Sequence, residues 1–537
     1  MGRFLNNKEP YDKFRTVMNG TYFVDKSEIL EELIPALQQE QRFFCITRPR
    51  RFGKTVMANM IAAFFENIGE KSLFRDLRIA RYEKYAEHIG QHDVIYIDFS
   101  EMPRECSNYH EYISRIQDGI ILDMIDIYPE MDIKKDMALW DILSLIFNKT
   151  GHKFVFIMDE WDALFHMSFI TDKVRENYLL FLKLLLKGQS YVELAYMTGV
   201  LPIAKYSDGS ELNMFLEYNM ATKVRFSEYF GFSDEEVDDL YARYLKKTKK
   251  PQITRENIRE WYDGYHTAAG NRLYNPRSVV CALTDNQLSN YWVSSGKYDS
   301  IFTYIKSNVD EIQNDLTLMF AGEKIPSGIQ EYAATAQTLK SKEEIYSAMV
   351  VYGLLTYDKG MVFIPNKELM GSYAAMMKKE KTLGYVYRLA NVSTKMLQAT
   401  LAGDTDTMTS IIEYAHNTEV PILSYNNEVE LSAIVNLVYL SARDQYRVER
   451  EDKAGKGYVD FIFYPIQYDQ DCIILELKVN HTPQEAIKQI KEKEYALRFK
   501  GKLDEKPLYT GRILAVGISY NSETKEHSCM VEEIKAC

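Results

Sequence analysis

The chain of 537 residues lacks the long apolar run that a membrane-spanning helix requires. No stretch approaches the roughly 18 to 20 consecutive apolar residues that are needed to cross the hydrocarbon core of a bilayer. The first residues, MGRFLNNKEPYDKF, also lack the apolar stretch of a secretory signal. We therefore expect a cytoplasmic protein with no membrane partner.

Cysteine is scarce, and its spacing excludes two further classes of protein. The six cysteines are Cys45, Cys106, Cys281, Cys472, Cys529 and Cys537, and none forms a C-x-x-C pair. The nine histidines are dispersed as well. This pattern argues against both a disulfide framework and a zinc cluster, and it favours reduced thiols. The sequence also contains no internal repeat and no low-complexity tract.

An excess of basic residues is also missing, since 65 Lys and Arg against 77 Asp and Glu give a net charge of −12. A protein of this charge does not bind nucleic acid over its whole surface, so any such contact must be local. Residues 488–502 supply it best, with six basic residues and two glutamates. A solubilising helix face remains the alternative. The length predicts about three domains, and 46% hydrophobic residues suffice for packed cores.

The most informative segment that is present is RFFCITRPRRFGKT, residues 42–55. An apolar strand leads into a turn that ends Gly53-Lys54-Thr55, and an apolar helix follows. This order is typical of a phosphate-binding loop, in which Lys54 reaches the β and γ oxygens of ATP and the Thr55 hydroxyl holds Mg²⁺. Arg48 occupies the place of the usual first glycine. A plain strand-to-helix turn with an exposed lysine therefore stays open as an alternative.

A second motif, which supports this interpretation of the first, follows about a hundred residues later in KFVFIMDEWDALF. The apolar strand 154–158 ends in Asp159-Glu160, which is a Walker B pattern. A carboxylate at the carboxyl end of a buried parallel strand lies near the phosphate loop, so Asp159 is predicted to hold Mg²⁺ and Glu160 to orient the attacking water. The alternative is that the two acids only cap a helix.

Two further strands, 93–99 and 192–199, fit the same sheet. Thr198 ends the second of them, and we predict that it contacts the γ-phosphate or the attacking water as a sensor, although threonine is also a common strand former. Arg50 and Arg51 lie inside the loop. They are predicted to clamp phosphate as forked donors, with a solvated basic loop as the alternative.

A second group of candidate catalytic residues lies in GKGYVDFIFYPIQYDQDCIILELKVN, which is predicted to form two strands joined by a polar turn. Residues two apart on a strand share a face, so Glu476 and Lys478 lie roughly 7 Å apart while Leu477 faces the core. If the neighbouring strand delivers Asp460, two carboxylates converge on one hard cation beside an ammonium. This arrangement predicts metal-assisted phosphodiester hydrolysis. A solvated strand face is the alternative.

Helices are predicted on both sides of these strands in the sequence. Glu428 and Glu430 precede an apolar helix upstream, and either is a candidate ligand of the same metal, or only a favourable charge at a helix N-terminus. The downstream segment HTPQEAIKQIKEKEYALRF is an amphipathic helix whose inward positions are predicted to be Ala486, Ile490 and Leu497.

Together these segments resemble the bacterial AAA-ATPase-like proteins whose C-terminal region is a PD-(D/E)XK nuclease-superfamily domain. The resemblance covers nearly the whole chain, from YFVDKSEIL through ITRPRRFGKT, IMDEWD, MTGVLPIAK, YFGFSDEEV and WYDGYHTAAGNRLYNPRSVV to the VDF, ELK and AIKQI segments. In that family an arginine commonly stands at the position of Arg48. Many relatives carry a histidine where this chain has Ser432.

The resemblance also implies roles for individual residues. It implies nucleotide contacts from Gly53, Lys54 and Thr55, and roles in metal and water binding for Asp159 and Glu160. It further implies a nuclease set, in which the polar helix position is Gln489, and whose other members are Glu428, Asp460, Glu476 and Lys478. The implied cofactors are ATP and Mg²⁺.

The predicted fold class is α/β, with four parts. A P-loop NTPase core of AAA-like type is expected at residues 1–225, a helical lid at 226–290, a helical connector at 291–415, and an α/β domain like a restriction endonuclease at 416–537. Ser233 and Glu236 form a predicted capping box at the start of a lid helix.

The predicted function is ATP binding and hydrolysis, coupled to Mg²⁺-dependent cleavage of nucleic acid, with DNA favoured over RNA. ATP would gate or power access to the cleavage site. The alternative is a nucleotide-dependent switch whose C-terminal fold has lost catalysis and binds nucleic acid or protein. A small-molecule kinase is a weaker third reading, because no acceptor-site aspartate has a recognisable phosphotransfer context. The sequence leaves assembly into a homo-oligomer open.

Overall fold

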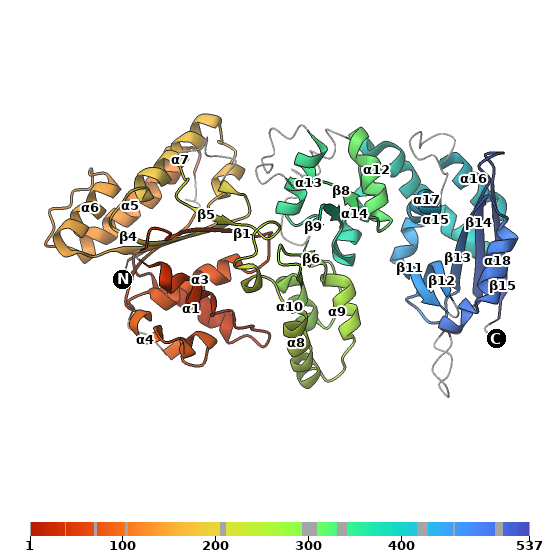
Figure 1. Cartoon of the computed structure of the whole chain (residues 1–537), viewed down its shortest axis with the longest axis horizontal. Coiled ribbons are helices and arrows are strands. Elements are labelled where there is room, and N and C mark those ends of the chain that lie inside the picture. The colour runs from red at the N-terminus through yellow and green to blue at the C-terminus, as the bar shows by residue number, and fades with distance from the viewer. Residues whose placement is uncertain are drawn as a thin grey trace. The chain divides into compact units, whose positions relative to one another are not determined.

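A computed structural model describes residues 2–37, 39–68, 72–101, 106–203, 211–292, 309–329, 341–415, 428–454, 457–499 and 509–535 (Figure 1). The chain divides into two compact units. The first comprises residues 1–301 and 326–369, and the second comprises 302–325 and 370–537. The predicted connector, residues 291–415, is thus shared between the two units, and the four predicted domain boundaries stay predictions.

The first unit is built on a five-stranded sheet in the order β2-β3-β4-β1-β5, and its strands pair in parallel. The strands are β1 (Phe43–Thr47), β2 (Asp93–Asp98), β3 (Phe154–Asp159), β4 (Val192–Gly199) and β5 (Leu216–Tyr218). The strands β1 and β3 are buried at every residue, as expected for parallel strands with both faces covered, whereas the short edge strand β5 is only partly buried. The four strands expected from the sequence are confirmed, and β4 lies between β1 and β3.

Helices cover both faces of this sheet, and Figure 1 shows α5–α7 on one side and α1, α3 and α4 on the other. Phe43 and Cys45 of β1 belong to the core under α5–α7, whereas Phe44 and Ile46 belong to the core under α1–α3. The helices are α1 (Lys8–Met18), α2 (Ile29–Leu33), α3 (Lys54–Phe65), α4 (Tyr85–His88), α5 (Tyr109–Ile127), α6 (Leu139–Thr150) and α7 (Asp172–Leu186).

The segment predicted to be a helical lid forms a small core of its own. It contains α8 (Asp234–Lys247), α9 (Arg255–Tyr262), the short strands β6 (Tyr265–His266) and β7 (Arg272–Leu273), and α10 (Pro276–Asp285). The capping box of Ser233 and Glu236 at the start of α8 is confirmed. Further along are β8 (Ile325–Pro326), α13 (Lys342–Val351), the hairpin strands β9 (Thr356–Asp358) and β10 (Met361–Phe363), and α14 (Lys367–Lys379).

The second unit contains a mixed five-stranded sheet in the order β11-β12-β13-β14-β15. Its pairs are antiparallel except β13 with β14, which run parallel and are connected by α18. The strands are β11 (Tyr446–Ala454), β12 (Gly457–Pro465), β13 (Cys472–Val479), β14 (Ile513–Tyr520) and β15 (His527–Ile534). The helices are α12 (Val309–Phe320), α15 (Gly384–Ala402), α16 (Thr405–Tyr414), α17 (Glu428–Val438) and α18 (Pro483–Glu492).

One predicted core position in this unit is wrong. Leu497 was expected to face inward, but it is 40% exposed. The reason is that α18 ends at Glu492, and Glu494 adopts a left-handed φ of 58°, so the helical periodicity does not continue. Tyr495 and Phe499 of the following short 3₁₀ helix, Tyr495–Phe499, are buried in its place.

In the described part of the chain, no helix combines the length and the apolarity that a bilayer crossing demands.

Candidate nucleotide and metal sites

The phosphate loop connects β1 to α3, and its backbone adopts the conformation that a cradle requires. Gly53 is the N-cap of α3 with a φ of 86°, a region that other residues rarely adopt. No described atom lies within 4 Å of the place where a Cβ would stand on Gly53. The loop therefore leaves open space in front of the N-terminus of a twelve-residue helix, which attracts anions.

Arg48, at the position of the usual first glycine, has a structural role. Its side chain is 1% exposed and donates hydrogen bonds to the carbonyl oxygens of Thr47 and Tyr218, both at 2.8 Å, and of Phe226 at 2.9 Å. The guanidinium also lies 4.8 Å from the centre of the Phe230 ring. Burial lowers the pKa of Arg48 to about 10. Arg48 thus joins the end of β1 to β5 and to the segment before α8.

Asp159, the last residue of β3, is a fully buried carboxylate whose Oδ2 has no hydrogen-bond partner within 3.5 Å among the described residues. Burial and the nearby Glu160 raise the pKa of Asp159 to about 7, and the Thr55 hydroxyl and the Lys54 ammonium oppose this rise. Thr55 is exposed, and Lys54 Nζ lies 3.3 Å from the carbonyl oxygen of Pro49. The structure therefore brings together the predicted Mg²⁺ ligands, and their oxygen atoms suit that ion.

Glu160 follows Asp159 with a φ of 51°, an uncommon conformation for a residue with a side chain. Burial raises the pKa of its carboxyl, and the positive charges of Lys54 and Arg50 oppose that rise. Backbone strain of this kind is found often at functional sites, where surrounding contacts maintain it.

Thr198 and the loop arginines have contacts of their own. The Thr198 hydroxyl donates to the carbonyl oxygen of Ile46 at 2.8 Å, so its proton holds β4 against β1. Arg50 acts electrostatically on Glu160, whereas Arg51 acts on the carboxyl of Glu368. The sensor role of Thr198 and the phosphate contacts of both arginines stay predictions.

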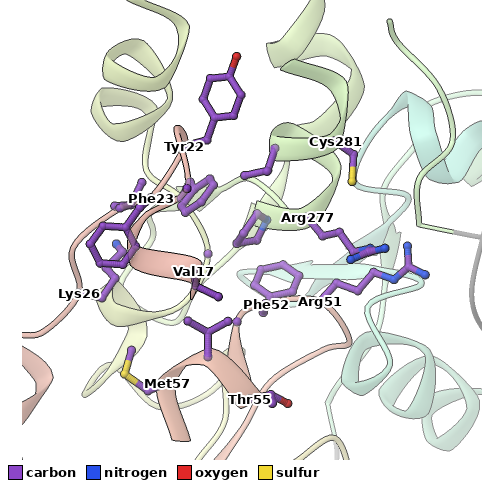
Figure 2. Close-up of a pocket in the computed structure, with 18 of the residues that line it drawn as sticks. Val17, Tyr22, Phe23, Lys26, Arg51, Phe52, Thr55, Met57, Arg277 and Cys281 are labelled. Atoms are coloured by element: carbon purple, nitrogen blue, oxygen red, sulfur yellow. The ribbon is translucent and has the colours of Figure 1, made fainter. Parts of the chain in front are cut away.

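A cavity of about 930 Å³ opens in front of the phosphate loop (Figure 2). Tyr22 and Phe23 line it on one side and α10 on another, with Glu160 and the loop itself also in contact with it. Arg277 and Arg51 both line this cavity (Figure 2). Arg277 was not predicted. Asn275 and Pro276 mark a helix start in the sequence, but no local pattern shows that this helix faces the loop.

The second site lies on β12 and β13 of the C-terminal sheet. Phe461 pairs with Leu475 and Ile462 with Ile474, and Asp460 is the next residue of β12. Asp460 Oδ2 accepts a hydrogen bond from the Leu477 amide at 2.7 Å. The carboxylate of Asp460 therefore lies beside the residue that follows Glu476, close enough for its charge to raise the pKa of Glu476.

Glu476 is 3% exposed, and its two oxygens differ. Oε1 accepts hydrogen bonds from Lys478 Nζ at 3.1 Å and from Gln489 Nε2, whereas no described residue bonds Oε2. Burial and the charge of Asp460 raise the pKa of Glu476 to about 7, and Lys478 opposes the rise. An unbonded buried carboxylate oxygen beside a second carboxylate is a suitable donor set for a hard cation.

The structure does not describe every side chain of the predicted nuclease site. Glu428 begins α17, but its side chain and that of Glu430 lie outside the described residues. No group of three or more His, Cys, Asp and Glu side chains gathers as a metal site within the described parts of the chain. Ser432, which stands where many relatives have histidine, accepts a hydrogen bond from Arg450 at 2.8 Å.

Comparison with known proteins assigns both regions. Residues 10–207 match the family model described as a predicted AAA-ATPase, and residues 426–527 match that of the PD-(D/E)XK nuclease superfamily. Together with the parallel sheet of the first unit and the mixed sheet of the second, these matches confirm the predicted α/β fold class.

Individual similarities are more distant. An uncharacterized protein from the vnfD 5′ region of Azotobacter chroococcum is 24% identical over 286 residues, which span 51% of this chain and 51% of that relative. A Walker-type ATPase of Pyrococcus abyssi gives a TM-score of 0.34 at 12% identity, covering 64% of this chain and 93% of the other. The ORC2 protein of Aeropyrum pernix gives 0.32 at 11% identity, with coverages of 69% and 95%.

Proposed function

We propose that this chain, which carries an AAA-ATPase-like domain at residues 10–207 and a PD-(D/E)XK nuclease-superfamily domain at 426–527, hydrolyses ATP and cleaves DNA with Mg²⁺. The observation that carries the cleavage half is that Asp460 accepts a hydrogen bond from the amide next to Glu476, while Lys478 is bonded to one oxygen of Glu476. ATP binding and hydrolysis control access to the cleavage site.

Each residue of the nucleotide site has a separate role in the binding and hydrolysis of ATP. The amides of the phosphate loop and Lys54 bind the phosphates, while Thr55 and Asp159 would hold Mg²⁺, which would supply positive charge to stabilise the phosphates. Glu160 orients the attacking water and accepts its proton. Burial raises the pKa of Glu160, which makes its carboxylate a stronger base.

The C-terminal site divides its work in a similar way. Asp460 and Glu476 would hold the cation, and bound Mg²⁺ supplies Lewis acidity that favours hydroxide over water at neutral pH. Lys478 stabilises the negative charge that develops on the phosphate. Gln489 donates to Glu476 Oε1 and so fixes the carboxylate, whose Oε2, bonded by no described residue, would be available to a cation.

Plasmid nicking with Mg²⁺ tests the cleavage half. Wild-type protein is expected to nick the plasmid, and Lys478→Ala and Asp460→Ala are expected to lose at least 100-fold in rate, on the order of a lost catalytic group. Lys379→Ala, which removes an exposed lysine elsewhere in the same unit, serves as the matched control. Equal inactivity of wild type and variants with Mg²⁺ and Mn²⁺ would support the nucleotide-dependent switch instead.

ATP turnover and binding test the other half. Lys54→Ala is expected to abolish ATP binding, whereas Glu160→Gln is expected to bind ATP and to hydrolyse it about 100-fold or more slowly. Unchanged turnover in both variants would contradict the assignment of the phosphate loop and of the Walker B strand.

A further inference from the structure

Four buried oxygen atoms in the first unit have no hydrogen-bond partner among the described residues. They are Asp159 Oδ2, Asn59 Oδ1 and the hydroxyl oxygens of Tyr96 and Tyr196. Each of these four residues is at most 6% exposed. A buried polar group without a hydrogen bond costs free energy, so folded proteins satisfy such groups with another residue or with an ordered water.

The sheet places the two tyrosines on either side of the strand that carries Asp159. Tyr96 of β2, Ile157 of β3 and Tyr196 of β4 form one row across the sheet. All three side chains belong to the core between the sheet and α1–α3. Asp159 follows Ile157 by two residues, and Met158 between them belongs to the opposite core, so Asp159 points to the α3 side as well.

Electrostatic effects agree with this placement. Burial raises the pKa of Tyr96 and of Tyr196, and in both cases the negative charge of Asp159 is the largest further cause of the rise. The Thr198 hydroxyl, two residues beyond Tyr196 on β4, opposes the rise in Tyr196 while it donates its own proton to the Ile46 carbonyl oxygen. The Tyr196 hydroxyl thus lies toward the end of β4 that is next to the phosphate loop.

Asn59 approaches the same row of side chains from the helix above the sheet. It follows Thr55 by four residues on α3, and residues four apart on a helix share a face. The Thr55 hydroxyl interacts with the carboxyl of Asp159, so this face of α3 is turned toward β3. Helix α3 also packs on β2 and β4, which carry the two tyrosines. Asn59 therefore lies one helical turn from the predicted Mg²⁺ ligands, on the sheet side of α3.

The four oxygen atoms match the hydrogen-bonding capacity of one water molecule. Each tyrosine hydroxyl can donate one hydrogen bond, whereas the oxygens of Asp159 and Asn59 only accept. A water molecule accepts from two donors and donates to two acceptors, and buried waters usually bond to polar groups that are otherwise unsatisfied. An ionised carboxylate has about four acceptor sites, so one bond from a water leaves the others of Asp159 for Mg²⁺.

We propose that Tyr96, Tyr196 and Asn59 hold a buried water molecule against the Asp159 carboxylate, and that this water positions the carboxylate for Mg²⁺. The two hydroxyls donate to the water, and the water donates to Asp159 and to Asn59. Both tyrosines are therefore positioning residues, which act on the metal site through the water. This inference rests on the proposed ATP hydrolysis and adds the residues that support its metal site.

Removal of single hydroxyl groups tests the proposal. Calorimetry measures the affinity of the full-length protein for a non-hydrolysable ATP analogue with and without Mg²⁺. Tyr96→Phe and Tyr196→Phe keep the rings, and each is expected to reduce the gain in affinity that Mg²⁺ produces by about 10-fold, the lower end of the usual effect of a supporting contact. The affinity without Mg²⁺ is expected to stay unchanged, because the loop amides and Lys54 bind the phosphates.

Tyr191→Phe is the matched control for these variants. Tyr191 is a buried tyrosine just before β4, and its hydroxyl donates to the Leu185 carbonyl oxygen at 2.6 Å. Loss of this hydroxyl is expected to lower stability and to leave the effect of Mg²⁺ unchanged.

A double-mutant cycle keeps the test independent of nucleotide binding. Urea denaturation of the nucleotide-free protein compares wild type, Tyr196→Phe, Asp159→Asn and the double variant. If a water links the two residues, their effects on stability are not additive, whereas those of Tyr191→Phe and Asp159→Asn are additive. Non-additivity supports the water even if the protein binds no ATP analogue, which would overturn only the nucleotide assignment. Additive effects, or an effect of Mg²⁺ that both tyrosine variants leave unchanged, would overturn the inference.

Discussion

The two candidate sites share one feature at the scale of single residues, namely a buried carboxylate with one oxygen that no described residue bonds. Asp159 and Glu476 both have a pKa raised to about 7, and in each case burial is the largest cause and a second carboxylate adds to it. An arrangement of this kind is unfavourable in the bare protein, and a divalent cation would compensate it. A bound cation would relieve this unfavourable burial, and the free energy gained in this way would add to the affinity for the cation.

The raised pKa of Glu476 predicts pH-dependent metal binding. Below about pH 7 the folded carboxyl is protonated, and a cation must displace that proton, so Ca²⁺ affinity is expected to fall up to about tenfold per pH unit below 7 and to level off above it. Calorimetric titration of the nucleotide-free protein at pH 6, 7 and 8 measures this. Glu476→Gln should remove the binding, while Glu533→Gln, a change on the exposed edge of the same unit, should not. Affinity that is constant across this range would contradict the prediction.

Replacing Arg48 by the glycine that is usual in a phosphate loop is expected to destabilise the protein. Arg48→Gly restores the standard first glycine, but it removes three hydrogen bonds, two of them fully buried, and leaves carbonyl oxygens without these donors. The expected loss is about 3 kcal/mol in the free energy of unfolding of the first unit. Urea denaturation measures it. Arg48→Lys should also be destabilised, because one ammonium does not match the geometry of a guanidinium fork. A glycine variant as stable as wild type would show that the buried contacts contribute little.

At the scale of elements, one glycine determines how α18 lies on the sheet. Gly517 of β14 pairs with Glu476 of β13. A Cβ on Gly517 would stand 2.4 Å from the Pro483 carbonyl oxygen and 3.1 Å from the Ala486 side chain, both on α18. The close approach of α18, which brings Gln489 to Glu476, therefore requires glycine at this position.

Gly517→Ala is accordingly expected to push α18 away and to break the bond between Gln489 and Glu476. Loss of such a supporting contact typically costs 10- to 100-fold in metal affinity, and we expect a decrease on that order for Ca²⁺. Gly328→Ala is a suitable control, because no described atom lies within 4 Å of its added Cβ and its φ is ordinary. If Gly517→Ala bound Ca²⁺ as tightly as wild type, the position of α18 would not control the site.

Glu368 links α14 to the helix that borders the nucleotide cavity. Its buried carboxylate accepts hydrogen bonds from the Ser278 hydroxyl of α10 at 2.8 Å and from the amides of Tyr291 at 2.8 Å and Trp292 at 2.9 Å. Burial raises its pKa from 4.5 to about 7. The folded state therefore binds more protons than the unfolded state between these values, and stability falls as pH rises through this window.

Glu368→Gln should remove that dependence, because the neutral amide keeps an acceptor for the same donors. We expect the variant to be more stable than wild type at pH 8, by at most about 3 kcal/mol, and similar to it at pH 4.5. Thermal midpoints between pH 4.5 and 8 measure the difference. An identical pH slope in both proteins would mean that another group causes it.

Local patterns were enough to predict most elements but not the contacts between distant segments. The strand before Asp159 could be predicted from its continuous apolar run, and the shared face of Glu476 and Lys478 could be predicted from their spacing. Both predictions were possible because burial and strand periodicity act on neighbouring residues. Arg277 and Tyr196 were missed because each acts on a segment far away in the sequence. Leu497 was placed wrongly because a left-handed residue interrupts the helix, and periodicity alone does not reveal such a break.

At the scale of the whole molecule, each of the two compact units contains one candidate site. The phosphate loop lies in the first unit, and Asp460 and Glu476 lie in the second. Units with separate cores often unfold in separate steps, and a ligand raises the stability of the unit that binds it. The sites can therefore be followed independently in the intact protein.

Calorimetric scanning is expected to show two transitions. A non-hydrolysable ATP analogue at 100 times its Kd should stabilise the first unit by about 2.7 kcal/mol, and Ca²⁺ without nucleotide should stabilise the second. Lys54→Ala and Glu476→Gln assign the transitions, because each should abolish one of the two shifts.

Control of cleavage by ATP requires more than two independent shifts. If the nucleotide favours the cleavage-competent state, the analogue must change the affinity of the second unit for Ca²⁺, and Ca²⁺ must change the affinity for the analogue by the same factor. We expect a factor of about 5 to 150, the usual range of such coupling. A factor of one in both titrations would contradict gating and would leave the ATPase and the nuclease as separate activities on one chain. Reciprocity makes the second titration an internal check on the first.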